Sequence, residues 1–186
     1  MSKRRRSDTK QVAQPERGPG EHLVYLGLGS NLGDRDTLLR RALDRLAPQA
    51  RITRVSSVWD TAPALVTDQP RFHNIVAEGL TSLDPFALLR LAKEIERALG
   101  REPGPRYGPR PIDIDILLYD DLLLDTPTLT IPHAGLAERP FALAPLAEIA
   151  PRAWHPALAA DAETLAAETL AAAASPADIR KVGPLG

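Results

Sequence analysis

The sequence predicts an α+β fold, in which helices pack on an antiparallel sheet in the order βαββαβ. Three observations predict this fold. Isoleucine and aspartate alternate with period two at residues 112–116, as in a β-strand. Apolar residues recur at helical spacing in two segments, residues 38–46 and 86–99. Short apolar segments flank both of these helical repeats.

The first half of the predicted order reads as strand, helix, strand. Residues 22–29 are a short apolar strand, and residues 30–34 form a turn that begins a helix. This helix ends at Pro48, because proline has no amide hydrogen with which to continue it. Residues 51–61 then alternate as one strand.

The second half repeats this order. Residues 72–80 read as a strand, and Asp84 with Pro85 begins the second helix, whose apolar stripe includes Phe86. Residues 101–111, rich in proline, glycine and arginine, form a loop that leads into the isoleucine–aspartate strand. This doubled order is that of a ferredoxin-like fold, with helices on one face of the sheet and the other face open to a ligand.

The two ends of the chain differ from its middle. Residues 1–22 are polar, with a basic cluster at 3–6, and are predicted to form a disordered tail. Residues 23–155 are predicted to form a single domain. Residues 156–186 are an alanine-rich extension, predicted to be helical over 157–174 and loose at its end.

Composition disfavours several classes of protein. The net charge of −1 gives no field that would attract nucleic acid or an anionic membrane. The absence of cysteine excludes disulfides, thiolate metal sites and cysteine nucleophiles. No apolar run approaches the ~20 residues of a membrane span, and the basic N-terminus lacks the apolar stretch of a signal peptide. We therefore expect a cytoplasmic protein. We also expect a monomer that acts on small molecules and binds neither nucleic acid nor a membrane.

The alternating strand is the strongest sign of chemistry. Its isoleucines face one side, and Asp113 and Asp115 face the other, with Cα atoms about 7 Å apart. Two carboxylates this close repel each other unless cations lie between them, and Mg²⁺ commonly binds one or two carboxylates together with phosphates. Arg110 lies just upstream, where its guanidinium can bind a phosphate through two hydrogen bonds. The alternative is a half-buried strand with a solvated face.

Five short motifs carry a resemblance to a known family. They are Leu-Gly-Ser-Asn-Leu-Gly at 28–33, Gln-Pro-Arg-Phe-His-Asn at 69–74, Gly-Pro-Arg-Pro-Ile-Asp-Ile-Asp at 108–115, Ile-Pro-His at 131–133 and Arg-Pro-Phe at 139–141. In order and spacing the chain resembles the 6-hydroxymethyl-7,8-dihydropterin pyrophosphokinases of folate biosynthesis, over roughly residues 23–155. The resemblance implies a ferredoxin-like fold. It also implies transfer of the β,γ-diphosphate of ATP to the pterin hydroxymethyl group, which leaves AMP.

The resemblance also implies roles for residues toward ATP and metal. Asp113 and Asp115 would bind two Mg²⁺ ions and, with Arg101 and Arg110, form the catalytic group. ATP, the co-substrate, would contact Glu96, Arg101, Arg110, Ile116, Thr130, His133 and Arg139. Arg106 is left open between a phosphate contact and a solvated loop residue.

A flat pterin ring with a polar edge requires stacking surfaces and a group that both donates and accepts hydrogen bonds. Phe72 and Asn74 are two residues apart on a strand, so they project from the same face. The resemblance implies that Phe72 and Phe141 sandwich the ring, that Asn74 binds its edge, and that Thr61 and the loop after it add backbone groups. The alternative is that both phenylalanines belong to the core.

Some positions depart from the family pattern, and two other functions stay open. Pro103, Tyr107, Thr128 and Ala134 replace residues common in the family, which affects loop closure and ATP affinity rather than the metal pair. No side-chain base for the pterin hydroxyl is evident. One alternative is another Asp-x-Asp, Mg²⁺-dependent phosphoryl or nucleotidyl transferase. The other is an RNA-binding sheet that stacks bases on aromatic residues, but only 4% of residues are aromatic.

Overall fold

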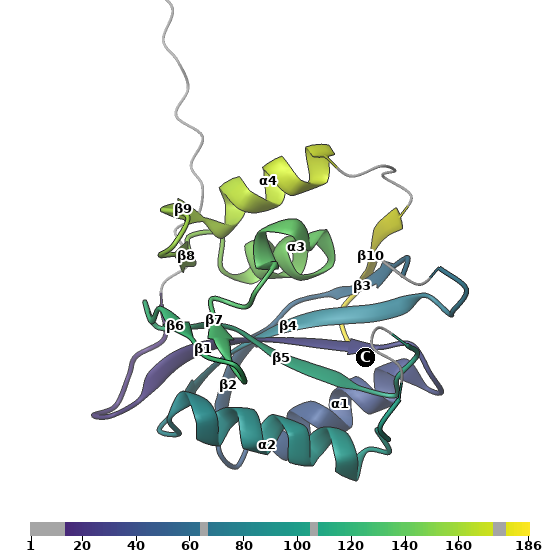
Figure 1. The fold of residues 1–186 in the computed structure, drawn as a ribbon, viewed down its shortest axis with the longest axis horizontal. Helices are drawn as coiled ribbons and strands as arrows, with labels where there is room; N and C mark the ends of the chain where they lie inside the picture. The colour runs from purple at the N-terminus through teal and green to yellow at the C-terminus, as the bar shows by residue number, and fades with distance from the viewer. Residues whose placement is uncertain (1–13, 64–66, 105–107, 173–177) are drawn as a thin grey trace, which may run out of the picture.

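A computed structural model describes residues 14–63, 67–104, 108–172 and 178–186. Within these residues the central element is a six-stranded antiparallel sheet with the order β10-β3-β4-β1-β5, in which β2 also pairs with β4 (Figure 1). Its strands are β1 (His22–Ser30), β2 (Arg51–Val55), β3 (Val58–Thr61), β4 (Phe72–Thr81), β5 (Asp113–Tyr119) and β10 (Ile179–Gly183). The order of β1, β2/β3, β4 and β5 confirms the ferredoxin-like fold.

The strand predicted over residues 51–61 is interrupted at Ser56 and Ser57, which separate β2 from β3. Ser56 makes two hydrogen bonds to Val76 of β4, and its hydroxyl also donates to the Ser57 carbonyl at 2.8 Å. Its N–H donates to the Val76 carbonyl at 2.9 Å, and its hydroxyl accepts from the Val76 N–H, also at 2.9 Å. A side-chain oxygen here replaces a backbone carbonyl, so the strand changes register without losing contact with β4.

Helices α1 (Arg35–Leu46) and α2 (Pro85–Ala98) cover one face of the sheet (Figure 1). The core beneath them includes Val24, Leu26 and Leu28 of β1 and the predicted isoleucines Ile112, Ile114 and Ile116. Each fully buried side chain of this size contributes about 1.5–3 kcal/mol. The prediction that Phe86 belongs to the apolar stripe of α2 is wrong, because Phe86 is 39% exposed. Leu88, Ala92 and Ile95 form the buried stripe of α2, and Phe86 points about 200° away from Leu88 around the helix.

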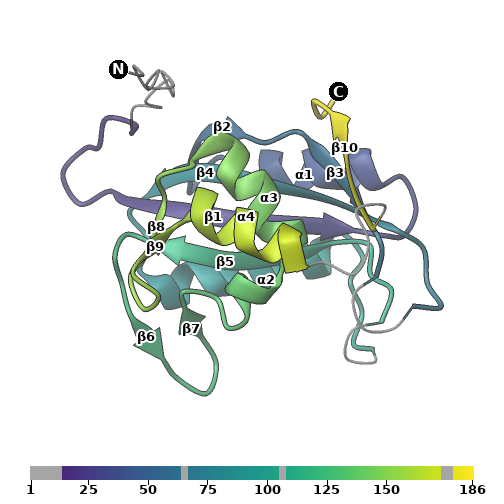
Figure 2. The same cartoon turned by 90° about the horizontal axis from the view of Figure 1, so that it is seen from above.

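The opposite face is only partly open, which corrects the prediction of an uncovered face. Helix α3 (Pro140–Ile149) lies on it, and α4 (Ala162–Ala172) packs over α3 (Figures 1 and 2). Leu143 and Leu146 of α3 join Leu23, Tyr25 and Leu117 of the sheet in a second core. Because α3 lies between the sheet and α4, it is apolar nearly all round.

The remaining elements are short. They are the strand pairs β6 (Leu124–Asp125) with β7 (Thr130–Ile131) and β8 (Trp154–His155) with β9 (Ala160–Asp161), and the single turn η1 (Leu136–Glu138). The second pair occupies the start of the predicted C-terminal helix, so α4 begins later than predicted. Asp161 begins it by accepting a hydrogen bond from the Thr164 N–H at 3.0 Å.

The described residues at both ends of the chain differ from the predicted structure. The final residues, predicted to be loose, include β10, which pairs with β3 at the edge of the sheet. At the other end, Arg17 forms an ion pair with Asp120 at 2.7 Å. The basic cluster at 3–6 lies outside the described residues. None of the described helices is both long and apolar enough to cross a membrane.

Candidate active site

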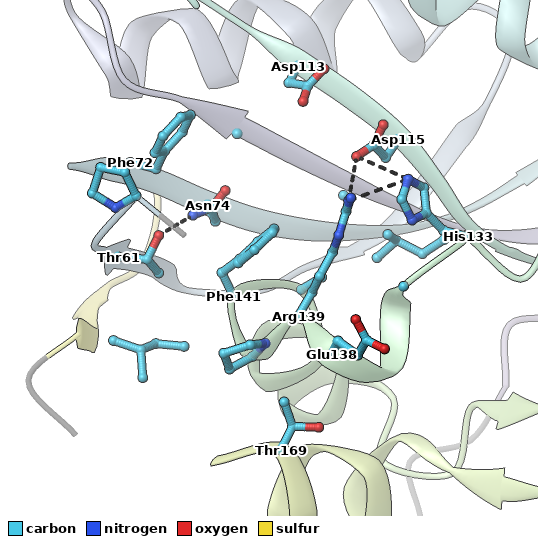
Figure 3. A pocket seen from close by; sticks show the side chains of 18 of the residues that line it. Thr61, Phe72, Asn74, Asp113, Asp115, His133, Glu138, Arg139, Phe141 and Thr169 are labelled. Atoms are coloured by element: carbon cyan, nitrogen blue, oxygen red, sulfur yellow. Dashed lines mark hydrogen bonds and ion pairs between the residues drawn. The ribbon is translucent and has the colours of Figure 1, made fainter. Parts of the chain in front are cut away.

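A cavity of about 1580 Å³ opens on the sheet face where α3 does not cover it. Residues of β1, β4 and β5 form its floor, and the segment before α3 and the C-terminal region form its walls (Figure 3). Most of the residues singled out from the sequence line this cavity: Thr61, Phe72, Asn74, Arg101, Arg110, Asp113, Asp115, His133, Arg139 and Phe141. The structure therefore brings both predicted halves of the site into one cavity.

Two glycines of β1 form the middle of the floor. Gly29 pairs with Asn74 on one side and Asp113 on the other, and Gly27 lies between β4 and Asp115 in the same way. A Cβ on Gly29 would lie 2.7 Å from Asn74 Oδ1, closer than real Cβ atoms come to other atoms. We call Gly27 and Gly29 the glycine trough. The sequence prediction missed it, although two glycines at strand period within an apolar strand were its signal.

On one side of the trough, Asp113 is held by two arginines. Arg110 NH1 lies 2.9 Å from Asp113 Oδ2, and Arg101 NH1 bonds the other oxygen, Oδ1. Burial raises the pKa of Asp113, but the charges of Arg110 and Arg101 outweigh burial and hold this pKa below its ordinary value. Asp113 is thus a carboxylate at neutral pH.

Glu96 lies beneath this pair and is 2% exposed. It accepts hydrogen bonds from Lys93 Nζ at 2.8 Å and from the Ile114 N–H at 2.7 Å, and it lies 2.7 Å from Arg101 NH1. Burial raises the pKa of Glu96, while Lys93 opposes that shift. Glu96 is absent from the cavity lining, so its contacts position Arg101 and the start of β5 from below.

Asp115 faces a second basic pair. His133 Nε2 and Arg139 NH1 each lie 3.6 Å from Asp115 Oδ2, and they are 3.4 Å from each other (Figure 3). The backbone N–H of His133 donates to the Leu117 carbonyl at 2.9 Å, which fixes this segment against β5. Burial lowers the pKa of His133, and Asp115 opposes that shift.

The other side of the trough is aromatic and contains the Asn74 amide. Figure 3 shows Asn74 between Phe72 of β4 and Phe141 at the start of α3. Asn74 Nδ2 donates to Thr61 Oγ1 at 2.7 Å, which fixes the orientation of the amide. The guanidinium carbon of Arg139 lies 5.8 Å from the centre of the Phe141 ring, so Arg139 contacts both ends of the cavity.

Some predicted site residues do not face the cavity. Ile116 is 3% exposed and belongs to the core under α1 and α2. Thr130 lies on β7, where its hydroxyl donates to Asp125 Oδ1 at 3.2 Å. Arg106 lies outside the described residues, as do Tyr107 and positions 64–66 of the loop after Thr61.

Asn31 is a residue whose role sequence reasoning missed. It is 2% exposed, and its Nδ2 donates to Gln69 Oε1 at 3.0 Å and to the Pro70 carbonyl at 3.1 Å. Its Oδ1 accepts from the Arg110 N–H at 2.8 Å. Asn31 therefore joins the loop before β4 to the loop that carries Arg110. The sequence reading assigned its motif only the shaping of a turn.

The carboxylate pair suits a hard cation. No group of three or more His, Cys, Asp or Glu side chains that could hold a metal gathers among the described residues. Asp113 and Asp115 offer only oxygen atoms and face the same cavity. Mg²⁺ is typically bound in this way, with substrate phosphates and water completing its coordination. The donor set therefore fits Mg²⁺ bound together with a phosphate-bearing substrate.

The fold and the site define a class: ferredoxin-like domains whose sheet carries paired aspartates among arginines. Within this class, the model of the 7,8-dihydro-6-hydroxymethylpterin-pyrophosphokinase family matches residues 25–151. The chain belongs to this family, as the sequence motifs predicted. It is 44% identical to the 2-amino-4-hydroxy-6-hydroxymethyldihydropteridine pyrophosphokinase of Bacillus subtilis, over 76% of this chain and 86% of that protein.

Some relatives are longer proteins. The chain is 50% identical to a mitochondrial folate synthesis bifunctional protein of Arabidopsis thaliana, over 69% of this chain but only 24% of that protein. The fold resembles the solved structure of a Plasmodium falciparum HPPK-DHPS triple mutant with SDX-DHP. The TM-score is 0.71 at 16% identity, over 87% of this chain and 48% of that one. This chain thus spans about a quarter of the first bifunctional relative and most of the B. subtilis enzyme.

Proposed function

We propose that this chain transfers the β,γ-diphosphate of ATP to the hydroxymethyl group of 6-hydroxymethyl-7,8-dihydropterin, yielding the pterin diphosphate and AMP in folate biosynthesis. Family membership supports this reaction. The observation that carries it is the single cavity, in which an aromatic and amide end faces an acidic and arginine-rich end across the glycine trough. Its volume of about 1580 Å³ exceeds the ~300–1,000 Å³ common for one small ligand, which suits two substrates.

The pterin occupies the aromatic end in this proposal. Its ring stacks between Phe72 and Phe141, and Asn74, held by Thr61, binds the polar edge of the ring. Asn74 and Asp113 are two strand spacings apart, about 10 Å. A bicyclic ring bound at Asn74 therefore extends over Gly29 and directs its hydroxymethyl arm toward Asp113.

The triphosphate of ATP occupies the other end. In the reaction the hydroxymethyl oxygen bonds to the β-phosphorus, and the bond from that phosphorus to the bridging oxygen breaks, so that this oxygen leaves with AMP. The hydroxyl proton passes to solvent water. Arg101, Arg110 and Arg139 now neutralise Asp113 and Asp115, and in the complex they contact the phosphate oxygens on which negative charge develops.

Asp113 and Asp115 would hold Mg²⁺, two ions by the family pattern, between their carboxylates and the phosphates. Bound there, Mg²⁺ supplies charge neutralisation and holds the phosphates in line with the attacking oxygen. With the two carboxylates neutralised in this way, Arg101, Arg110 and Arg139 would be available to contact the substrate phosphates. The predicted cytoplasmic location, monomeric state and lack of nucleic-acid binding stay predictions.

The product that ATP yields tests this function. The full chain is incubated with ATP, Mg²⁺ and 6-hydroxymethyl-7,8-dihydropterin, and nucleotide products are separated by chromatography. We expect AMP and the pterin diphosphate in equal amounts, and neither product with 6-methyl-7,8-dihydropterin, which lacks the acceptor hydroxyl. Formation of ADP would instead support the alternative, a different Asp-x-Asp transferase.

A binding measurement complements the product test. Calorimetric titration of the pterin is compared with and without Mg²⁺ and a non-hydrolysable ATP analogue. We expect the analogue to strengthen pterin binding, because both ligands occupy one cavity and its loops are joined through Asn31. Equal pterin affinity in both titrations would contradict a shared site that closes around both ligands.

A further inference from the structure

The C-terminal strand β10 borders the aromatic end of the cavity, although it lies far from that end in sequence. Ile179 pairs with Thr61 of β3, and Asp178 and Ile179 line the cavity beside Thr61 and Ala62. In Figure 1, β10 runs along the edge of the sheet next to β3. A segment beyond the region matched by the family model, residues 25–151, thus contributes to the wall of the site.

One backbone carbonyl connects this strand to the loop that enters the cavity. The Asp178 carbonyl accepts from the Ala62 N–H at 2.8 Å, and it also accepts from Arg71 NH2 at 3.4 Å. The Arg71 guanidinium contacts both the carboxylate and the backbone carbonyl of Asp60. The end of β3 is therefore held on its outer side by β10, at the point where Thr61 holds Asn74.

The same strand is tied to α3 on the other wall. Lys181 Nζ lies 3.0 Å from Glu148 of α3. Glu148 also accepts from Trp59 Nε1 at 2.9 Å and from the Ser57 hydroxyl at 2.8 Å, both adjacent to or within β3. Because α3 begins beside Phe141, this network links β10 and β3 to the helix that carries one stacking ring.

We propose that β10 is a positioning element of the pterin site. By closing the sheet edge it holds the Thr61 and Ala62 backbone, and through Thr61 the Asn74 amide, in the orientation that binds the polar edge of the pterin. This inference rests on the pterin location given under the proposed function. Without β10, β3 would become an edge strand, and the end of β3 would lose the hydrogen bond that fixes Ala62.

The ladder pattern identifies a substitution that removes one backbone hydrogen bond between β10 and β3. In an antiparallel pair, hydrogen-bonded and non-bonded positions alternate. Since Ala62 donates to Asp178 and Ile179 pairs with Thr61, Arg180 opposite Asp60 is the next hydrogen-bonded position. Arg180→Pro removes this N–H donor. Arg180→Ala removes the same side chain, which is 73% exposed, and keeps the N–H.

Steady-state kinetics of the full chain test the proposal. We expect Arg180→Pro to raise the KM for the pterin about tenfold, as the loss of one to two hydrogen bonds would, and to leave the KM for ATP within twofold. Arg180→Ala should match the wild type in both. Equal pterin KM values for the two variants would overturn the proposal, and so would a parallel rise of both KM values in Arg180→Pro.

Hydrogen exchange on the wild-type chain tests the contact without a substitution. We expect the Ala62 amide to exchange slowly in the free protein, because it donates to Asp178, and more slowly still with pterin bound. An Ala62 amide that exchanges as fast as an unstructured peptide would overturn the proposal, even if Arg180→Pro fails to fold.

A third variant separates this inference from the proposed function. Asn74→Ala should raise the pterin KM on its own. If Asn74→Ala raises it and Arg180→Pro does not, the role of β10 is wrong and the pterin location stands. If Asn74→Ala leaves the pterin KM unchanged, the pterin location is wrong and the role of β10 fails with it.

Discussion

Different interactions set the geometry of the acidic end and of the aromatic end of the cavity. At the acidic end, Asp113 and Asp115 are surrounded by Arg101, Arg110 and Arg139, and its geometry depends on ion pairs. At the aromatic end, strand pairing and packing set the geometry, with one amide–hydroxyl bond at its centre. The acidic end must exchange partners when a charged substrate arrives, whereas the aromatic end is formed in advance.

The largest expected effect comes from removing one carboxylate at the acidic end. Asp113→Asn or Asp115→Asn should lower kcat at least about a thousandfold, because charge stabilisation of the transferring phosphates is lost. AMP formation under saturating substrates measures this effect. Asp121→Asn, at an exposed carboxylate just after β5, is the control and should keep full activity. Near-normal turnover in either site variant would rule out the proposed metal role.

At the aromatic end, the effect should fall on binding rather than on turnover. Phe141→Ala should raise the pterin KM about 10–30-fold, because one stacking face is lost, with little change in kcat. Phe86→Ala removes an exposed ring on α2 and should leave the pterin KM unchanged. A fall in kcat without a rise in KM would show that the ring serves the chemistry and not the pterin.

The glycine trough lies between the two ends of the cavity. Substitutions there test where the pterin end stops and the nucleotide end begins. In Gly29→Ala, the new methyl group would meet Asn74 Oδ1 at 2.7 Å and turn the amide away, so the pterin KM should rise about tenfold. Gly27→Ala should have a smaller effect, since its nearest neighbour at 3.2 Å is the end of the Leu117 side chain. If the KM for ATP rose instead, Gly29 would belong to the nucleotide side.

The smallest expected effect concerns acid stability, at the network that joins β10 and β3 to α3 behind the aromatic end. Burial raises the pKa of Glu148, but hydrogen bonds from Ser57, Lys181 and Trp59 hold it below its ordinary value of 4.5. Since the folded pKa is lowered, the carboxylate stabilises the fold above about pH 4.5 and loses this effect as the pH falls through the folded pKa. Urea unfolding should show Glu148→Gln less stable than wild type at pH 6 and closer to it at pH 3. An equal difference in the free energy of unfolding between the variant and the wild type at both pH values would contradict this role.

Much of the sheet and two of its helices could be predicted, because each of those elements carries its own periodicity. The Ile–Asp alternation of β5 and the apolar repeats of α1 and α2 indicated where each element lies and most of its buried residues, with Phe86 the exception. Helix α3 could not be found in this way. It contains Pro145, and a helix buried on most sides has no polar face to mark its period. Strand β10 could not be found by its pattern either, because it includes the charged residues Arg180 and Lys181. Pairing with β3 holds it as a strand.

The site divides in the same manner. Asp113, Asp115, Phe72 and Asn74 could be proposed because each pair lies two residues apart on one strand. Asn31 and the glycine trough acquire their roles from strands and loops distant in sequence. Glu96 was predicted to contact ATP, but the structure buries it beneath Arg101, a position that depends on the packing of α2 against β5.

Asn31 has a thermodynamic consequence for the two substrates. Its amide is shared between Pro70, next to the pterin end, and Arg110, next to the phosphate end. A ligand that shifts either loop must change the free energy of the other, and such linkage is reciprocal by necessity. If the nucleotide raises the affinity for the pterin by some factor, the pterin must raise the affinity for the nucleotide by the same factor. Weakening the hydrogen bonds of this amide would therefore reduce both effects equally.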